Sequence, residues 1–149
     1  MTNTIDKFTA QYSFLSNFHP ASNLKGEDDL GQFEYPTAEH KFQAMKCVEG
    51  DSMRREISKA STPGKAKKLG RKVNLRPGWD EMRISVMMAI IQEKFAPDTQ
   101  LAQQLIDTAP AELIEGNTWN DRFWGVCRGK GQNHLGKALM EWRSRLIGD

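Results

Sequence analysis

The chain has 149 residues, of which 38% are hydrophobic and 27% charged, and its formal net charge is +2. This composition fits one globular domain with its own core and excludes a disordered or fibrous chain. The net charge is too small to imply broad electrostatic binding to a polyanion, so a basic cluster has to be argued locally. No run approaches the roughly 18 apolar residues that span a membrane, and the start lacks the features of a signal peptide. We therefore expect a single domain over residues 1–149, in the cytoplasm, with no membrane partner.

The first third of the chain combines a loop-like segment with a helix. Aromatic and polar residues alternate from Phe8 to Phe33 without helical spacing, which favours short strands or an aromatic-anchored loop. Thr37 is then the expected N-cap of a helix over residues 37–49, with Gly50 near its end.

Three polar side chains of this helix, Glu39, Gln43 and Lys46, fall on one stripe. At about 100° per residue they lie within roughly 60° of arc, next to the apolar stripe that includes Phe42. One interpretation is a solvent-side network, which stabilises a helix by only about 0.2 to 0.5 kcal/mol. The adjoining apolar stripe favours partial burial instead.

Two further helices follow. Ser61 or Thr62 caps a short helix that Gly70 ends. The longest periodic segment, residues 78–96, has apolar residues at helical spacing and stops before Pro97, so it is the expected central core helix. A basic stretch, KAKKLGRKV at 65–73, begins in the short helix and continues past its end, and it favours either a solvated face or phosphate contacts. Arg71 is its best candidate for a directed phosphate contact.

The last third contains two more helices with an unusual loop between them. Asp98 is the expected cap of a helix through residue 109, and ELIEG at 112–116 has the composition of a short strand. Asn133 is the expected cap of the final helix. The segment 117–133 carries tryptophans, asparagines, an aspartate and glycines, which suits a nucleotide-binding loop better than a simple connector.

The cysteine and histidine content argues against metal or thiol chemistry. Two cysteines and three histidines supply no spaced zinc set and no disulfide framework, so we expect no metal and no other cofactor. His40 and Cys47 are spaced to share a helix face as a nucleophilic pair. We favour a buried, inert Cys47 and a surface His40.

The ordered motifs resemble one family. FLSNF, YPTAEHKFQAMK, LGRKV, RPGWDEMRISVM with EKF, and WGVCRGKGQNHLGKALMEWR together resemble the NADAR family, also called YbiA-like, over residues 14–146. The resemblance implies a mainly α fold with minor β (α+β) in a single compact domain. It also implies an enzyme that cleaves N-glycosidic bonds between a base or amine and a phosphorylated ribose.

The resemblance further implies substrates and site residues. The expected partners are a small-molecule phosphoribosyl or ADP-ribosyl substrate, such as an early phosphorylated intermediate of riboflavin synthesis, and ADP-ribosylated guanine in nucleic acid. Some members have WGDG where this chain has Trp124, Gly125, Val126 and Cys127, which leaves the loop's carboxylate role to Asp121. The family pattern maps catalytic roles onto Glu39, Lys46 and Asp121 and substrate binding onto Arg71, Trp79, Trp124 and Asn133.

The chemistry of C1–N cleavage agrees with these roles, since it needs an anion near C1 and a proton donor for the leaving nitrogen. Glu39 is the expected carboxylate. At about 6 Å and an effective dielectric near 20, it attracts Lys46 by roughly 3 kcal/mol, which favours the charged amine by about two pKa units. Lys46 is then a better proton donor or phosphate contact than nucleophile, unless desolvation outweighs this attraction.

Two other functions remain open from the sequence. The same stripe and loop could hold ADP-ribose or a nucleotide without cleaving it, as a non-catalytic binding module. A nucleic-acid-binding protein is a weaker alternative, because it rests on the basic stretch alone and the net charge is only +2.

Overall fold

The computed structural model describes residues 3–148, which form six α-helices, one 3-10 helix and six short strands. The predicted mainly α fold with minor β is therefore confirmed. Contacts within the chain define two compact units, one of residues 17–94 and one of residues 1–16 with 95–149. The expectation of a single domain over the whole chain stays a prediction.

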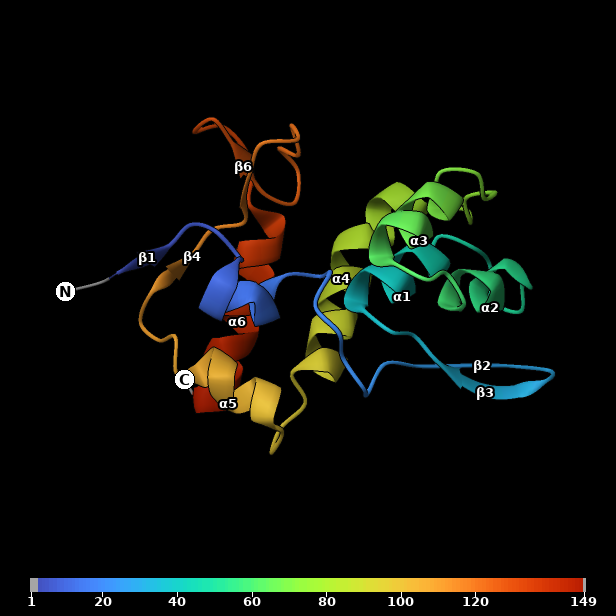
Figure 1. The fold of residues 1–149 in the computed structure, drawn as a ribbon, viewed down its shortest axis with the longest axis horizontal. Coiled ribbons are helices and arrows are strands. Elements are labelled where there is room, and N and C mark those ends of the chain that lie inside the picture. Colours follow the sequence, from blue (N-terminus) through green and yellow to red (C-terminus); the bar gives the residue numbers. More distant parts are fainter. Residues whose placement is uncertain (1–2, 149) are drawn as a thin grey trace. The chain divides into compact units, whose positions relative to one another are not determined.

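The continuous unit, residues 17–94, is built on four helices, and α1 packs against each of the other three (Figure 1). Two threonines begin helices as predicted: the Thr37 side chain accepts a hydrogen bond from the His40 amide, and Thr62 accepts one from the Lys65 amide. The helices are α1 (Ala38–Ala44), α2 (Met53–Ser58), α3 (Pro63–Gly70) and α4 (Trp79–Lys94).

Helix α1 is shorter than predicted. It ends at Ala44 rather than near residue 49, and Lys46 lies in the following turn, where its amide donates to the Gln43 carbonyl. The Arg76 amide donates to the Lys46 carbonyl over 2.8 Å, so a distant segment fixes this turn. The prediction that His40 lies at the surface is also wrong: it is 1% exposed, and its ring bonds Thr37 and the Ala60 carbonyl. Cys47 is buried as predicted.

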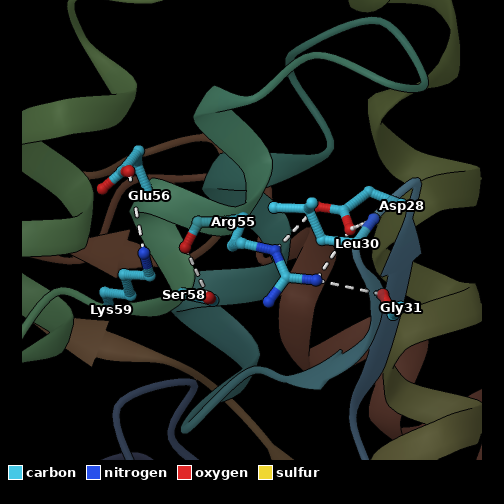
Figure 2. Close-up of polar contacts among 7 residues, drawn as sticks. All are labelled: Asp28, Leu30, Gly31, Arg55, Glu56, Ser58 and Lys59. Atoms are coloured by element: carbon cyan, nitrogen blue, oxygen red, sulfur yellow. Dashed lines mark hydrogen bonds and ion pairs between the residues drawn. The ribbon is translucent and has the colours of Figure 1, made fainter.

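A β-hairpin of β2 (Lys25–Asp28) and β3 (Gly31–Glu34) belongs to the same unit. Figure 2 shows how α2 holds its tip: the Arg55 guanidinium donates to both carboxylate oxygens of Asp28, over 2.7 and 2.8 Å, and to the Gly31 carbonyl. This forked bond keeps the pKa of Asp28 at about 2. The hairpin is therefore pinned by a side chain as well as by its own strand pairing.

The second unit joins both ends of the chain. Strand β1 (Thr4–Ile5) pairs in parallel with β4 (Glu112–Leu113), and β5 (Gly116–Asn117) pairs in parallel with β6 (Val126–Cys127). Its helices are η1 (Ala10–Leu15), α5 (Gln100–Ile106) and α6 (His134–Ile147). The strands near ELIEG agree with the prediction, although the segment divides between β4 and β5. The short 3-10 helix η1 was predicted as strand or loop, because its aromatic residues have no α-helical spacing.

Of the two predicted caps of this unit, Asp98 is wrong, and Asn133 has the predicted position without a side-chain cap bond. Thr99 caps α5 by accepting a hydrogen bond from the Ala102 amide, while Asp98, one residue earlier, turns the chain at φ 68°. Asn133 is the N-cap residue of α6, but its side chain makes no cap hydrogen bond. Its Oδ1 instead accepts from the Glu115 amide and its Nδ2 donates to the Leu113 carbonyl, over 2.9 Å each. Asn133 therefore ties the β4–β5 segment to the start of α6.

Between residues 3 and 148 no helix is both long enough and apolar enough to cross a membrane. Within the same range, no group of three histidine, cysteine or acidic side chains is placed to hold a metal ion.

Candidate active site

Glu39 lies in the first turn of α1 and is 9% exposed. Its amide donates to the Asn17 carbonyl, so the segment before the hairpin anchors the start of the helix. Its carboxylate accepts a hydrogen bond from Gln43 Nε2, one helical turn later. A nearly buried carboxylate held by an amide donor is suited to stabilise positive charge or to accept a proton.

Lys46 is close enough to Glu39 for the two charges to interact. Burial lowers the pKa of Lys46, the Glu39 carboxylate acts in the opposite direction, and the charges of Arg71 and Lys67 add to the lowering. The net direction is downward, so desolvation outweighs the attraction of the carboxylate. A lysine of this kind gives up its proton more readily than an ordinary one.

Arg71 directly follows α3 and is exposed. Its charge acts on Lys46, which places the predicted phosphate contact beside the predicted acid. Gly70, the last residue of α3, allows α3 to lie close to the Gln43 side chain of α1. A Cβ at this position would lie 1.9 Å from Gln43 Oε1. Only a glycine leaves room for the Gln43 amide between α1 and α3.

Trp79 begins α4 and is 6% exposed. Its ring packs on Phe42 of α1 with centroids 5.3 Å apart. The tryptophan therefore supports the helix that carries Glu39.

Asp121, in the second unit, organises the loop between β5 and β6. Its Oδ1 accepts from the amides of Phe123 and Trp124 over 3.1 and 3.0 Å. The Asn117 side chain holds the main chain of Asp121 from the other side, donating to its carbonyl and accepting from its amide. Oδ1 of Asp121 thus stabilises the conformation of this loop.

Trp124 follows in the same loop and is partly buried. Its carbonyl accepts from the Leu135 amide, and its ring meets Phe123 edge-on with centroids 4.8 Å apart. Trp119, which the sequence did not distinguish as a ligand contact, is 62% exposed. In this loop Trp124 therefore packs against its neighbours, whereas Trp119 is exposed to solvent.

The seven predicted site residues form two groups. Glu39, Lys46, Arg71 and Trp79 come together in the unit of residues 17–94, where α1 meets α3 and α4. Asp121, Trp124 and Asn133 come together at the start of α6 in the other unit. A cavity of about 360 Å³ in this second unit, between η1 and the end of α5, is lined by none of the seven.

Sequence reasoning missed one polar residue of the first group, Gln43, and one buried lysine elsewhere in the same unit, Lys94. Gln43 was noted only as part of the stripe, although it bonds Glu39 directly. Lys94 ends α4 and is 1% exposed, and burial lowers its pKa to about 7. Its spacing of seven residues from Met87, on the buried side of α4, was the available signal.

The comparison with known proteins identifies the family. The model of the NADAR domain matches residues 5–147. The chain belongs to the NADAR family. N-glycosidase YbiA of Escherichia coli (strain K12) is 41% identical over 148 residues, which cover 89% of this chain and 88% of the E. coli protein. The NMR structure of E. coli YbiA matches with a TM-score of 0.77 and 36% identity, over 99% of this chain and 87% of that one.

A third NADAR relative is longer. Riboflavin biosynthesis protein PYRR of Zea mays, described as chloroplastic, is 34% identical over 149 residues, which cover 92% of this chain but 24% of the maize protein. The resemblance seen in the sequence motifs is thus confirmed, and so is the fold it implied. The predicted enzyme class, a hydrolase of N-glycosyl bonds, is confirmed at the level of the family.

Proposed function

We propose that this NADAR chain hydrolyses the bond between C1 of a phosphoribosyl or ADP-ribosyl group and the nitrogen of a base or amine. The observation that carries the proposal is the pairing of a nearly buried carboxylate, Glu39, with a lysine whose pKa burial lowers. Relatives named N-glycosidase and riboflavin biosynthesis protein support the reaction class.

Two side chains, Glu39 and Lys46, carry the proton transfers of the proposed reaction. As the C1–N bond breaks, positive charge develops at C1 and the leaving nitrogen gains electron density. Glu39 stabilises the charge at C1 and takes the proton of the water that adds there, while the Lys46 ammonium protonates the leaving nitrogen. Glu39 then holds one proton too many and Lys46 one too few. Because the two groups interact electrostatically, transfer of that proton between them restores both.

The other predicted residues are assigned to binding and support. Arg71 is proposed to contact a phosphate of the substrate, since its exposed guanidinium acts on Lys46 and suits bidentate phosphate binding. Trp79, in the same unit, is proposed to support the site through its contact with Phe42. The substrate contacts that the family resemblance implies for Trp124 and Asn133, in the other unit, stay predictions. The carboxylate role that the resemblance implies for Asp121, also in the other unit, stays a prediction; one of its oxygens accepts the Phe123 and Trp124 amides.

The decisive experiment offers two substrates to the purified protein: a phosphoribosylaminopyrimidine intermediate of riboflavin synthesis and an oligonucleotide carrying ADP-ribosylated guanine. Mass spectrometry then follows the free base or amine and the released sugar. Release from either compound supports the proposed reaction and identifies the substrate. Binding of either compound without release would instead indicate a non-catalytic nucleotide-binding module.

Glu39→Gln is the matched catalytic variant, because it removes the charge and keeps the shape. We expect it to abolish turnover while ligand affinity stays within about tenfold, or about 1.4 kcal/mol. Calorimetric titration with the substrate measures the affinity. Unchanged turnover in Glu39→Gln would remove Glu39 from the mechanism.

Borohydride reduction during turnover tests the role of Lys46. A neutral lysine amine can attack C1 and form an imine with the opened sugar, which borohydride reduces to a stable adduct. Burial lowers the pKa of Lys46, which favours the neutral amine but also makes the ammonium a stronger acid. The proposed proton-donor role rests on this stronger acidity and predicts no adduct on Lys46. An adduct mapped to Lys46 by peptide mass spectrometry would show the covalent route.

A further inference from the structure

Gln43 combines two features that are unusual for a buried amide. It is 4% exposed, and its Nε2 donates to the Glu39 carboxylate. Its Oε1 is also buried but has no hydrogen-bond partner among the described residues. A buried carbonyl without a partner costs roughly 1 to 3 kcal/mol, so the orientation of this amide needs a compensating interaction.

The compensating interaction is the bond to Glu39. A hydrogen bond to a charged acceptor is about twice as strong as one between neutral groups. Rotating the amide by 180° would turn Oε1 toward the carboxylate and place two acceptors in contact. The Glu39 carboxylate therefore selects the observed orientation, and in turn receives a donor that does not move.

Gly70 completes this arrangement from the neighbouring helix. Its missing side chain leaves the space that Gln43 Oε1 occupies, because a Cβ would lie 1.9 Å from this atom and 2.7 Å from Cδ. The amide is thus confined between α1 and α3 with its NH₂ group directed at Glu39.

We propose that Gln43 is a positioning residue that holds the Glu39 carboxylate ionised and in one orientation for cleavage of the N-glycosidic bond. It acts through Glu39 and needs no contact with substrate. This inference rests on the proposed function for its catalytic consequence, but the effect on Glu39 itself can be measured without any substrate.

The sign of the effect follows from the bond. A donor stabilises the charged carboxylate, so its removal raises the pKa of Glu39. Lys46, on the same segment, also favours the charged form, and it is kept in every variant. Other charged groups near α1 likewise stay constant; those of the helices packed on it include Arg54, Arg55, Glu56, Lys67, Arg71, Arg83, Glu93 and Lys94.

The test compares Gln43→Met, which keeps the size but cannot donate, with Gln43→Glu, which adds a like charge. In each folded variant, carbon-13 NMR titration of the side-chain carboxyl follows Glu39 without ligand. We expect the Glu39 midpoint to rise by about half to one pH unit in Gln43→Met and further in Gln43→Glu. The acid limb of kcat/KM should move by the same amount, with kcat reduced about tenfold at neutral pH and KM within about twofold.

The chain offers a matched control on α5. Gln103 Nε2 donates to Asp107 Oδ1 over 2.8 Å with the same four-residue spacing, but on an exposed face. Gln103→Met should change neither the Glu39 titration nor the kinetics. A Glu39 titration in folded Gln43→Met that coincides with wild type would overturn the inference, whether or not the protein cleaves an N-glycoside. A shifted titration in a protein without activity would support the inference and overturn only the proposed reaction.

Discussion

Burial changes the acid–base properties of two lysines that the sequence presents as ordinary cations. Lys46 interacts with the Glu39 carboxylate, yet the direction of its pKa shift is set by desolvation. Lys94 is buried more completely, and its pKa falls to about 7. Burial lowers the pKa of His19 in the segment before the hairpin, and the charge of Lys94 adds to this lowering. Burial thus lowers the pKa of two lysines in this unit, and that of Lys94 lies near neutral pH.

Lys94 should give the stability of the protein a distinct pH dependence. Its folded-state pKa lies below that of the unfolded chain, 10.5, so the unfolded state binds the extra proton between about pH 7 and 10.5. The free energy of unfolding should therefore rise with pH in this window, by about 1.4 kcal/mol per pH unit relative to Lys94→Met. Urea denaturation at several pH values measures both slopes.

The exposed Lys137 of α6 provides the control for this measurement. Lys137→Met should keep the slope of wild type, because an exposed lysine has nearly the same environment in both states. Parallel stability curves for wild type and Lys94→Met would show that Lys94 ionises normally in the folded protein.

The contact between α1 and α3 depends on the last residue of α3. Gly70→Ala places a Cβ against the Gln43 amide, so either α3 moves or the amide leaves Glu39. We expect a loss of about 1 to 3 kcal/mol in the free energy of unfolding, as for overpacked cores. Chemical denaturation measures the change.

Gly64, in the first turn of α3, is the matched substitution. A Cβ there meets only the Thr62 hydroxyl, at 3.9 Å. Gly64→Ala should therefore leave stability unchanged or raise it by up to about 1 kcal/mol. If Gly64→Ala and Gly70→Ala lowered the free energy of unfolding equally, alanine would destabilise α3 at either position. The close approach of Gly70 to Gln43 would then not explain the loss.

The hairpin β2–β3 depends on α2 through the forked bond between Arg55 and Asp28 (Figure 2). The pKa of Asp28 is lowered from 3.8 to about 2, so the bond's contribution is complete above about pH 4 and is lost as the pH falls through about 2. Asp28→Asn should remove this contribution at neutral pH and speed amide hydrogen exchange in residues 25–34.

The pair of Lys25 and Glu34 in the same hairpin provides the comparison. Their side chains are 56% and 62% exposed, and exposed pairs contribute little. Lys25→Met should leave hydrogen exchange in the hairpin nearly unchanged. If Asp28→Asn left it unchanged too, strand pairing alone would account for the hairpin.

Across the chain, local patterns predicted the elements better than the contacts between them. Thr37 and Thr62 cap their helices as predicted, because a cap needs only the next three residues. Asn133 was misjudged because its amide bonds Leu113 and Glu115, far away in sequence. The same holds for the candidate site. The local motifs indicated Glu39 and Lys46, but the burial of Lys46 depends on contacts with segments that are distant in the sequence.

The chain should unfold as one cooperative unit despite its two groups of contacts. Domain boundaries usually lie in exposed linkers, but the boundary after α4 falls between Lys94 and Phe95, which are 1% and 0% exposed. We expect amide signals of α1 and α6 to disappear at the same urea concentration in an NMR titration. Two separate midpoints would show that the chain contains two domains.

The parallel pairing of β1 with β4 also constrains the order in which the protein can fold during synthesis. Thr4 leaves the ribosome early but pairs with Glu112, so it must wait for most of the chain. The unit of residues 17–94 is continuous, and its contacts can form while the rest is still being made. The nascent chain therefore carries β1 unpaired until β4 has been made, and closing the long loop between them has an entropic cost.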